Sequence, residues 1–321
     1  MTQLDLFGNE VRGIEFPGSP IFSVDWSYSK MQAFRDCPRK YYFLYYGSKK
    51  KKALNEPLKE RLIELARMSN KYMVQGNLIH QMISLYFKKA KQGELWDLKR
   101  LTSFVSMIVN ETFVHNENVR AGRAVENLKY PKPVLKELFY SSVDDGQLKK
   151  EILDVTIACL THFFLSDLYE PIRRGGALPS SVIEGDTTFS INDVISVDGK
   201  VDIAYVDDSR LIITDWKTGK REMQDTSLQL LVYALWARQL KDWKFAVVDI
   251  QKGYLADGSL EKLQFSETHI HRARVRIMQD AELLMEMDEY GKGSVRDAFA
   301  KHEGKNCKTC PFEEICFQKL S

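Results

Sequence analysis

The sequence lacks any long apolar run and any strong excess of one charge. No stretch reaches membrane-spanning length, and the first residues, MTQLDLFGNEVRG, lack the apolar core of a signal peptide. We therefore expect a cytoplasmic protein without a membrane partner. The formal net charge is only +2, so composition alone does not indicate nucleic-acid binding, and any basic surface must be local. Internal repeats and low-complexity tracts are lacking as well, which together with 44% hydrophobic residues indicates an ordinary globular protein.

Cysteine is scarce, with five residues in the chain, and a cytoplasmic protein seldom uses it for structural disulfides. Three of the five lie close together, at Cys307, Cys310 and Cys316, and this spacing indicates a metal site. Tetrahedral zinc or an iron–sulfur cluster requires a fourth thiolate. Cys159 lies in the apolar run ILDVTIACL, which favours a buried free thiol. Cys37 lies at a predicted helix break and is therefore the predicted fourth ligand.

β-Branched residues and tight turns predict three strands between residues 182 and 217. The first is 182–191, the second runs from 194 through Asp198-Gly199 to 206, and the third is 211–217 after a turn at 207–209. The third contains the run LIIT, which is apolar enough for a strand buried on both faces.

Helical periodicity predicts most of the remaining elements. A helix started by Ser27 is interrupted at Cys37-Pro38 and continues as a segment dense in tyrosine, whose rings we assign to the core rather than to base stacking. Further predicted elements are helices at 77–90, 94–119, 132–140, 147–169, 227–240 and 268–290, and a strand at 245–255.

Asp215 and Lys217 lie on one face at the end of the third predicted strand, and Asp202 lies on the strand before it. A pair of carboxylates suits Mg²⁺ or Mn²⁺, and a nearby lysine can orient a metal-bound water and stabilise developing negative charge. A bare D-x-K sequence is common, and its alternative interpretation is a solvated surface turn. Thr218-Gly219 after it and the carboxylate on the preceding strand favour the metal site.

Three further polar residues are candidates for the same site. His80 lies at the start of a predicted helix, where a single histidine is more often structural than a ligand. Gln229 and Tyr233 are four residues apart and therefore share one helix face. A glutamine amide can position water or phosphate, and a tyrosine can brace a lysine, but this pair alone indicates no function.

Taken in order along the chain, these residues resemble the PD-(D/E)xK nuclease superfamily. The resemblance is to its RecB/AddB-type branch with a four-cysteine iron–sulfur cluster, which includes the CRISPR-adaptation exonucleases. The matching motifs, which span 27–317, are Cys37-Pro38, Gly76-x₃-His80, Glu184, Gly199-x₂-Asp202, Asp215-Trp216-Lys217-Thr218-Gly219, Gln229-x₃-Tyr233 and Cys307-x₂-Cys310-Pro311-Phe312-x₃-Cys316.

The resemblance implies an α/β (α+β) fold in which a mixed sheet, with an α-β-β-β-α-β core, is flanked by helices. It adds a large helical insertion and a C-terminal iron–sulfur staple. The parts expected along the chain are a flexible leader at 1–20, an N-terminal segment with the first cluster cysteine at 21–53, a helical region with the histidine motif at 54–180, the nuclease core at 181–256, and a C-terminal helix with the cysteine cluster at 257–321.

The resemblance also implies Mg²⁺- or Mn²⁺-dependent hydrolysis of DNA phosphodiester bonds. The implied roles are metal binding by Asp202 and Asp215, with His80 as a further ligand or as the residue that holds the metal-bound water. Lys217 would assist the attacking water, Gln229 and Tyr233 would position DNA and Lys217, and Glu184 or, as an alternative, Asp186 would make an acidic contribution. The four cysteines, Cys37, Cys307, Cys310 and Cys316, would hold a structural [4Fe–4S] cluster, with Zn²⁺ as the alternative.

Three activities stay open at this point. The first is an exonuclease on single-stranded DNA or DNA ends, in replication, repair, recombination or phage defence. The second is an endonuclease or nickase on the same fold, and the third is a catalytically silent DNA-binding subunit. The complete set of carboxylates and lysine favours an active enzyme. The chain carries no helicase motif, so any unwinding would require a helicase partner.

A short segment near the N-terminus suggests another partner. Gln3-Leu4-Asp5-Leu6-Phe7 resembles the peptide by which bacterial proteins dock on the replicative sliding clamp. Such a peptide inserts its apolar residues into a pocket of the clamp. The alternative is a leader that packs Leu6 and Phe7 on its own domain.

Overall fold

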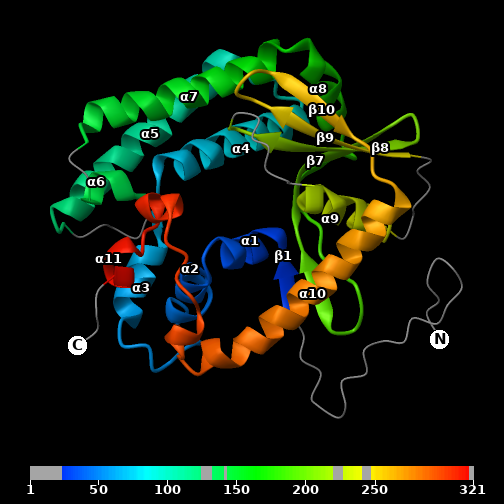
Figure 1. Ribbon diagram of the computed structural model, residues 1–321. Coiled ribbons are helices and arrows are strands. Elements are labelled where there is room, and N and C mark those ends of the chain that lie inside the picture. The colour runs from blue at the N-terminus through cyan, green and yellow to red at the C-terminus, as the bar shows by residue number, and fades with distance from the viewer. Residues whose placement is uncertain (1–23, 124–131, 141–142, 220–226, 241–246, 318–321) are drawn as a thin grey trace, which may run out of the picture.

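A five-stranded mixed sheet forms the centre of the molecule (Figure 1). Its strands follow the order β10-β9-β8-β7-β4, in which β8 and β9 run parallel and the other neighbours run antiparallel. They are β4 (Val182–Asp186), β7 (Lys200–Asp207), β8 (Arg210–Lys217), β9 (Val247–Tyr254) and β10 (Ser259–Leu263). The structure is a computed structural model that describes residues 24–123, 132–140, 143–219, 227–240 and 247–317. The mixed α/β architecture predicted from the sequence is confirmed.

Two smaller sheets accompany the central one. One has the order β1-β6-β5, with β1 (Val24–Ser27) parallel to β6 (Ile195–Asp198) and β5 (Phe189–Ser190) antiparallel to it. The other pairs β2 (Met68–Ser69) with β3 (Val134–Leu135). The sequence did not predict β1, β2, β3 or β10, because strands this short carry little periodicity.

Two of the predicted strands are each divided in the structure. The stretch predicted as one strand at 182–191 forms β4 and β5, and the stretch at 194–206 forms β6 and β7. The chain turns a corner there between two sheets. At this corner the Thr187 N–H donates to the Gly199 carbonyl over 2.9 Å, and a Cβ on Gly199 would lie only 2.4 Å from Thr187 Oγ1. Glycine permits this close approach, and the corner places Lys200 at the start of β7.

A two-residue turn joins β7 to β8, within the turn predicted at 207–209. Asp207 pairs with Arg210, and the residues between them, Asp208 and Ser209, have φ values of 43° and 64°. Two positive φ values in a two-residue hairpin match the right-handed twist of the strands. The turn sets a register in which Ile203 lies opposite Thr214.

The long helices overlap the predicted ones, but capping residues set their ends. The short helices Lys59–Ala66, Glu170–Gly176 and Glu313–Phe317 were not predicted individually, and residues 134–135 of the helix predicted at 132–140 form β3. α4 begins six residues earlier than predicted, because Asn70 accepts a hydrogen bond from the Met73 N–H. In the same way Asp144 caps α7. The α-helices of the described residues are α1 (Tyr28–Asp36), α2 (Pro38–Tyr42), α3 (Lys59–Ala66), α4 (Lys71–Ala90), α5 (Leu98–Arg120), α6 (Lys136–Tyr140), α7 (Asp145–Leu165), α8 (Glu170–Gly176), α9 (Ser227–Ala237), α10 (Glu267–Lys292) and α11 (Glu313–Phe317). Short π or 3-10 turns are η1 (Phe43–Gly47), η2 (Asp167–Tyr169), η3 (Arg296–Ala298) and η4 (Lys305–Thr309).

Helices cover both faces of the central sheet. On one face Trp216 of β8 packs edge-on against Phe163 of α7 and Tyr169 of η2. On the other face the buried residues of α9 and α10 share a core with Ile213 and Ile250. Among the described residues no single helix is long and apolar enough to cross a membrane, although α7 and the segment 167–176, bent by 70°, reach that length and composition together.

The N- and C-terminal segments lie side by side, blue against red in Figure 1. Tyr42 and Phe43 are buried and pack against Phe299 and Phe312 of the tail. The Arg39 guanidinium also donates to the Phe299 carbonyl over 2.9 Å. The aromatic segment is therefore core, as predicted, and it fastens the two ends of the described chain together.

Candidate active site

Three neighbouring strands each carry one carboxylate to the same place. Glu184 lies on β4, Asp202 on β7 and Asp215 on β8. The register Ile203↔Thr214 makes Asp202 and Asp215 the next residues along the two antiparallel strands. Side chains in such positions lie close together on one face. The hairpin turn therefore creates a site with concentrated negative charge.

Glu184 has an unusual backbone conformation. The residues on either side of it pair regularly with β7, as Ile183↔Ile203 and Gly185↔Val201, but Glu184 itself has φ = 52° and makes no such pair. A left-handed conformation within a strand costs a non-glycine residue about 1–3 kcal/mol, and such strain concentrates at functional sites. Two side chains contact the carboxylate: Lys200 Nζ lies 2.6 Å from one oxygen and His80 Nδ1 lies 3.9 Å from the other.

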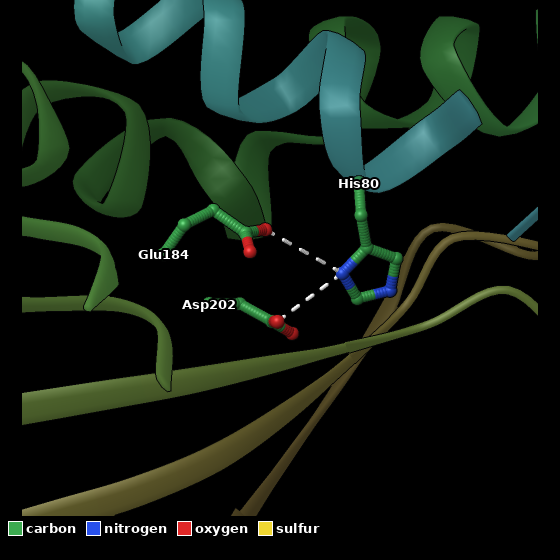
Figure 2. A group of neighbouring side chains, drawn as sticks. All are labelled: His80, Glu184 and Asp202. Atoms are coloured by element: carbon green, nitrogen blue, oxygen red, sulfur yellow. Dashed lines mark hydrogen bonds and ion pairs between the residues drawn. The ribbon is translucent and has the colours of Figure 1, made fainter. Parts of the chain in front are cut away.

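His80 completes a group of three candidate metal ligands (Figure 2). It projects from α4, and its Nδ1 lies 3.1 Å from Asp202 Oδ1. One ligand atom each from His80, Glu184 and Asp202 lies within 4.8 Å of the others. Burial opposes the charged form of His80, but the hydrogen bond and charge of Asp202, with the charges of Asp215 and Glu184, outweigh it, so the pKa of His80 is raised. The three carboxylates around His80 therefore favour positive charge at its ring.

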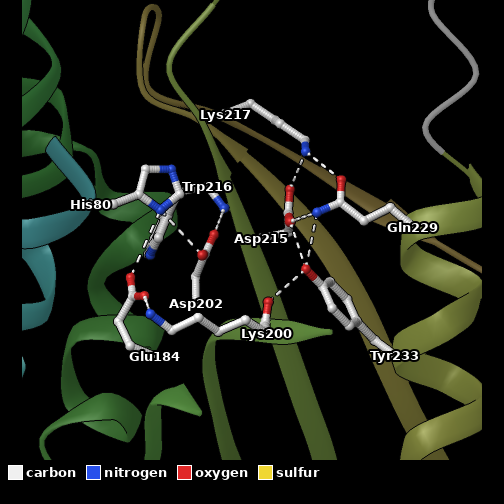
Figure 3. A network of polar contacts seen from close by, with 9 residues as sticks. All are labelled: His80, Glu184, Lys200, Asp202, Asp215, Trp216, Lys217, Gln229 and Tyr233. Carbon is white, nitrogen blue, oxygen red and sulfur yellow. Dashed lines mark hydrogen bonds and ion pairs between the residues drawn. The ribbon is translucent and has the colours of Figure 1, made fainter. Parts of the chain in front are cut away.

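Asp215 is the centre of a second network on the side of α9 (Figure 3). Lys217 Nζ lies 2.6 Å from Asp215 Oδ2 and donates to Gln229 Oε1 over 2.9 Å. The Gln229 amide donates in turn to Asp215 Oδ1 over 3.0 Å, and the Tyr233 hydroxyl lies 3.2 Å from the same oxygen. The Gln229 amide therefore joins Lys217 to Asp215, and Tyr233, its predicted partner on the same helix face, contacts Asp215 as well.

Asp215 is almost completely buried, with 2% of its surface exposed. Burial raises the pKa of its carboxyl, the charge of Asp202 raises it further, and Lys217 opposes both. The Lys217 ammonium contacts Asp215 Oδ2 over 2.6 Å. Asp215 is not one of the three residues whose ligand atoms lie within 4.8 Å of one another, so it lies beside the group His80–Glu184–Asp202 and not within it. The carboxylate oxygens of this site suit a divalent cation such as Mg²⁺ or Mn²⁺, which prefers oxygen donors.

The structure brings together every residue predicted for this site. Glu184 rather than Asp186 lies in the group of candidate ligands. Two contacts were not predicted: the ion pair of Lys200 with Glu184, and the Trp216 N–H, which donates to Asp202 Oδ2 over 2.6 Å. Lys200 has one sequence signal, because it precedes Asp202 by two residues and so shares its strand face.

The predicted cysteines lie around one pocket between α2, η4 and α11, near the paired chain ends. Those lining it are Cys37, Cys307, Cys310 and Cys316. All are free thiols, and Cys159 is a buried thiol elsewhere. Burial raises the pKa of Cys310 and of Cys316, while Lys40 opposes the rise at the first and Lys301 at the second. Among the described residues no three of the thiols lie within 4.8 Å of one another. In the part of the chain that the structure describes, the four thiols therefore line one pocket without forming a close metal-binding group.

Comparisons with known proteins agree with this site. A family model for the PD-(D/E)XK nuclease superfamily matches residues 25–317. No curated protein matches the sequence. A solved crystal structure of SSO0001 is 16% identical over 68% of this chain and 98% of that chain, with a TM-score of 0.31, and carries no argument. Because the family match spans most of the sequence, including all the site residues, the chain belongs to the PD-(D/E)XK nuclease superfamily.

Proposed function

We propose that this protein is a Mg²⁺- or Mn²⁺-dependent deoxyribonuclease that acts as an exonuclease on single-stranded DNA or DNA ends. The observation that carries the proposal is the group His80–Glu184–Asp202, with ligand atoms within 4.8 Å, beside the Asp215–Lys217 pair. A surface turn would leave these groups apart and solvated. A buried carboxylate with a raised pKa next to a lysine is instead typical of catalytic sites.

In this proposal His80, Asp202 and Asp215 hold the ion, and Glu184 contributes a further oxygen. When bound, the ion supplies charge for the phosphate oxygens and lowers the pKa of a water. Lys217 orients that water and stabilises negative charge that develops on the phosphate. Because Lys217 donates to Gln229 Oε1 over 2.9 Å, its ammonium is fixed in place before substrate arrives.

Gln229 should therefore act as a positioning residue. Gln229→Ala removes the amide that joins Lys217 to Asp215, and we expect cleavage to slow by about 10- to 100-fold because misplacement of a catalytic group by about 1 Å costs as much. Gln229→Glu keeps the acceptor for Lys217 but loses the N–H that donates to Asp215 and places a second carboxylate beside it, so this variant should also be slow. Equal rates for wild type and Gln229→Ala in a single-turnover cleavage assay would contradict this role.

We further propose that the chain is of the RecB/AddB type and that Cys37, Cys307, Cys310 and Cys316 hold a [4Fe–4S] cluster. The four thiols around one pocket support this proposal, as does the scarcity of other cysteines. Zn²⁺ bound by the same thiolates is the alternative. Iron and zinc analysis of anaerobically purified protein separates the two.

The sliding-clamp peptide, Gln3–Phe7, lies outside the described residues. We propose it as a docking segment for a bacterial sliding clamp and expect that Leu6→Ala with Phe7→Ala abolishes binding, since the apolar side chains fill the clamp pocket. Calorimetry with purified clamp measures this, and Thr2→Ala is the control. A wild-type protein that binds no clamp rules the partner out.

The choice between exonuclease and endonuclease follows from substrate topology. We expect cleavage of labelled linear single-stranded DNA and little cleavage of circular DNA, because an exonuclease requires an end. Cleavage of circles would support the endonuclease or nickase, and binding without cleavage would support a silent subunit. Stimulation on duplex DNA by an added helicase would support the helicase partner. We also propose a cytoplasmic location, as the sequence analysis expects.

A further inference from the structure

Lys200 is placed unusually for a surface lysine. It lies two residues before Asp202 on β7, and its Nζ lies 2.6 Å from Glu184 Oε2. The side chain is 55% exposed, whereas that of Glu184 is 19% exposed. The Lys200 ammonium therefore contacts a candidate metal ligand from the solvent side. Figure 3 shows this contact across the site from Lys217 and Gln229.

A hydrogen bond holds the backbone of Lys200, whereas its side chain is partly exposed to solvent. Its carbonyl accepts a hydrogen bond from the Tyr233 hydroxyl over 2.9 Å, and that hydroxyl also contacts Asp215. The corner at Gly199 holds the preceding residue. The ammonium ends a flexible four-carbon chain in partial contact with water, so it can leave Glu184 without movement of the strand.

A divalent ion and Lys200 would compete for Glu184. Without the ion, Lys200 balances the charge of a carboxylate whose backbone is in a left-handed conformation. With the ion, Glu184 is neutralised by a stronger cation, and the ammonium becomes free. It then lies at the solvent-exposed edge of a site where DNA phosphates would lie, and a lysine is a general phosphate ligand.

We propose that Lys200 is an exchangeable counter-ion: it holds Glu184 in the metal-free protein and binds a DNA backbone phosphate once a divalent ion has taken Glu184. This inference rests on the proposed function. It makes two predictions of opposite sign, because Lys200→Ala should strengthen metal binding and weaken DNA binding. A merely structural lysine would weaken both or change neither.

The first measurement is Mn²⁺ binding to the DNA-free protein by calorimetry. Lys200→Ala should bind Mn²⁺ about two- to fivefold more tightly than wild type, as expected from loss of a partly exposed ion pair. Lys200→Arg keeps the charge and should resemble wild type. Lys150→Ala is the matched control, because Lys150 is an exposed lysine that pairs with Asp154 within α7.

The second measurement is the salt dependence of binding to a single-stranded oligonucleotide with Mn²⁺, in a Lys217→Ala background that prevents cleavage. Adding Lys200→Ala should weaken DNA binding. It should also reduce the magnitude of the slope of log binding constant against log salt concentration by about 0.7–1, the value for one lost phosphate contact. Without Mn²⁺ the slope should change little, because Lys200 is then paired with Glu184.

The outcomes separate this inference from the proposed function. Tighter Mn²⁺ binding together with the smaller slope supports it. If wild type binds Mn²⁺ but Lys200→Ala leaves the metal affinity unchanged or weakens it, or leaves the slope unchanged, the counter-ion role is wrong and the nuclease proposal stands. If wild type binds no Mn²⁺, both are wrong.

Discussion

Lys217→Ala is expected to slow DNA cleavage by about 10²–10⁴-fold, the range for loss of a group that assists proton transfer or stabilises developing charge. Lys217 Nζ lies 2.6 Å from Asp215 Oδ2 and 2.9 Å from Gln229 Oε1, so its ammonium is held at the candidate site. A single-turnover assay with labelled single-stranded DNA and Mg²⁺ measures the loss.

Two controls make this prediction specific. Lys150→Ala removes an exposed lysine on α7 that pairs with Asp154 and should leave cleavage unchanged. Lys217→Ala leaves the buried Asp215 without its ionic partner and should lower the melting temperature, so cleavage is compared at a temperature at which thermal unfolding shows the variant to be folded. A variant that cuts as fast as wild type would remove Lys217 from the mechanism.

Among the proposed variants, Cys310→Ser is expected to lower the free energy of unfolding most and to remove iron from the protein. The cluster would join Cys37 to a tail roughly 270 residues later, and closing so long a loop constrains the unfolded chain by about 5–6 kcal/mol in the entropy model. The measured loss should be smaller, because Arg39–Phe299 and Phe43–Phe312 also hold the two ends together. Iron content and thermal unfolding of anaerobically purified protein measure both effects.

The matched control is Cys159→Ser. Cys159 is 2% exposed, and burial raises its pKa to about 11, as expected for a thiol that stays neutral in an apolar core. This variant should lose some stability through the buried hydroxyl but keep its iron. If Cys310→Ser retains full iron content and its melting temperature, the cluster proposal is wrong.

Most of the active-site geometry could be predicted from local patterns. Strand alternation places Asp215 and Lys217 on one face, and the turn at Asp208-Ser209 brings Asp202 beside them. Helical spacing puts Gln229 and Tyr233 together. These contacts follow from residues close in sequence or joined by a short hairpin, for which periodicity and turn chemistry suffice.

The parts that could not be predicted depend on pairing between distant segments. The left-handed Glu184 and its ion pair with Lys200 arise only once β4 is placed on β7. β1 pairs with β6, which lies far from it along the chain, and no pattern within the four residues of β1 specifies that partner. The corner at Gly199 likewise depends on two sheets, which is why the sequence predicted one strand where the structure has two.

Membership of the PD-(D/E)XK nuclease superfamily indicates a metal-dependent nuclease with a nucleic-acid substrate. The most direct test incubates purified wild-type protein and Asp202→Asn with end-labelled linear single-stranded DNA in Mg²⁺, Mn²⁺ or EDTA. We predict that wild type cleaves with either metal ion and does not cleave in EDTA. Asp202→Asn should be inactive, because the substitution removes the charge of a candidate ligand that contacts His80. Absence of cleavage by wild type with both ions, or equal cleavage by the variant, would contradict a metal-dependent active site at these residues.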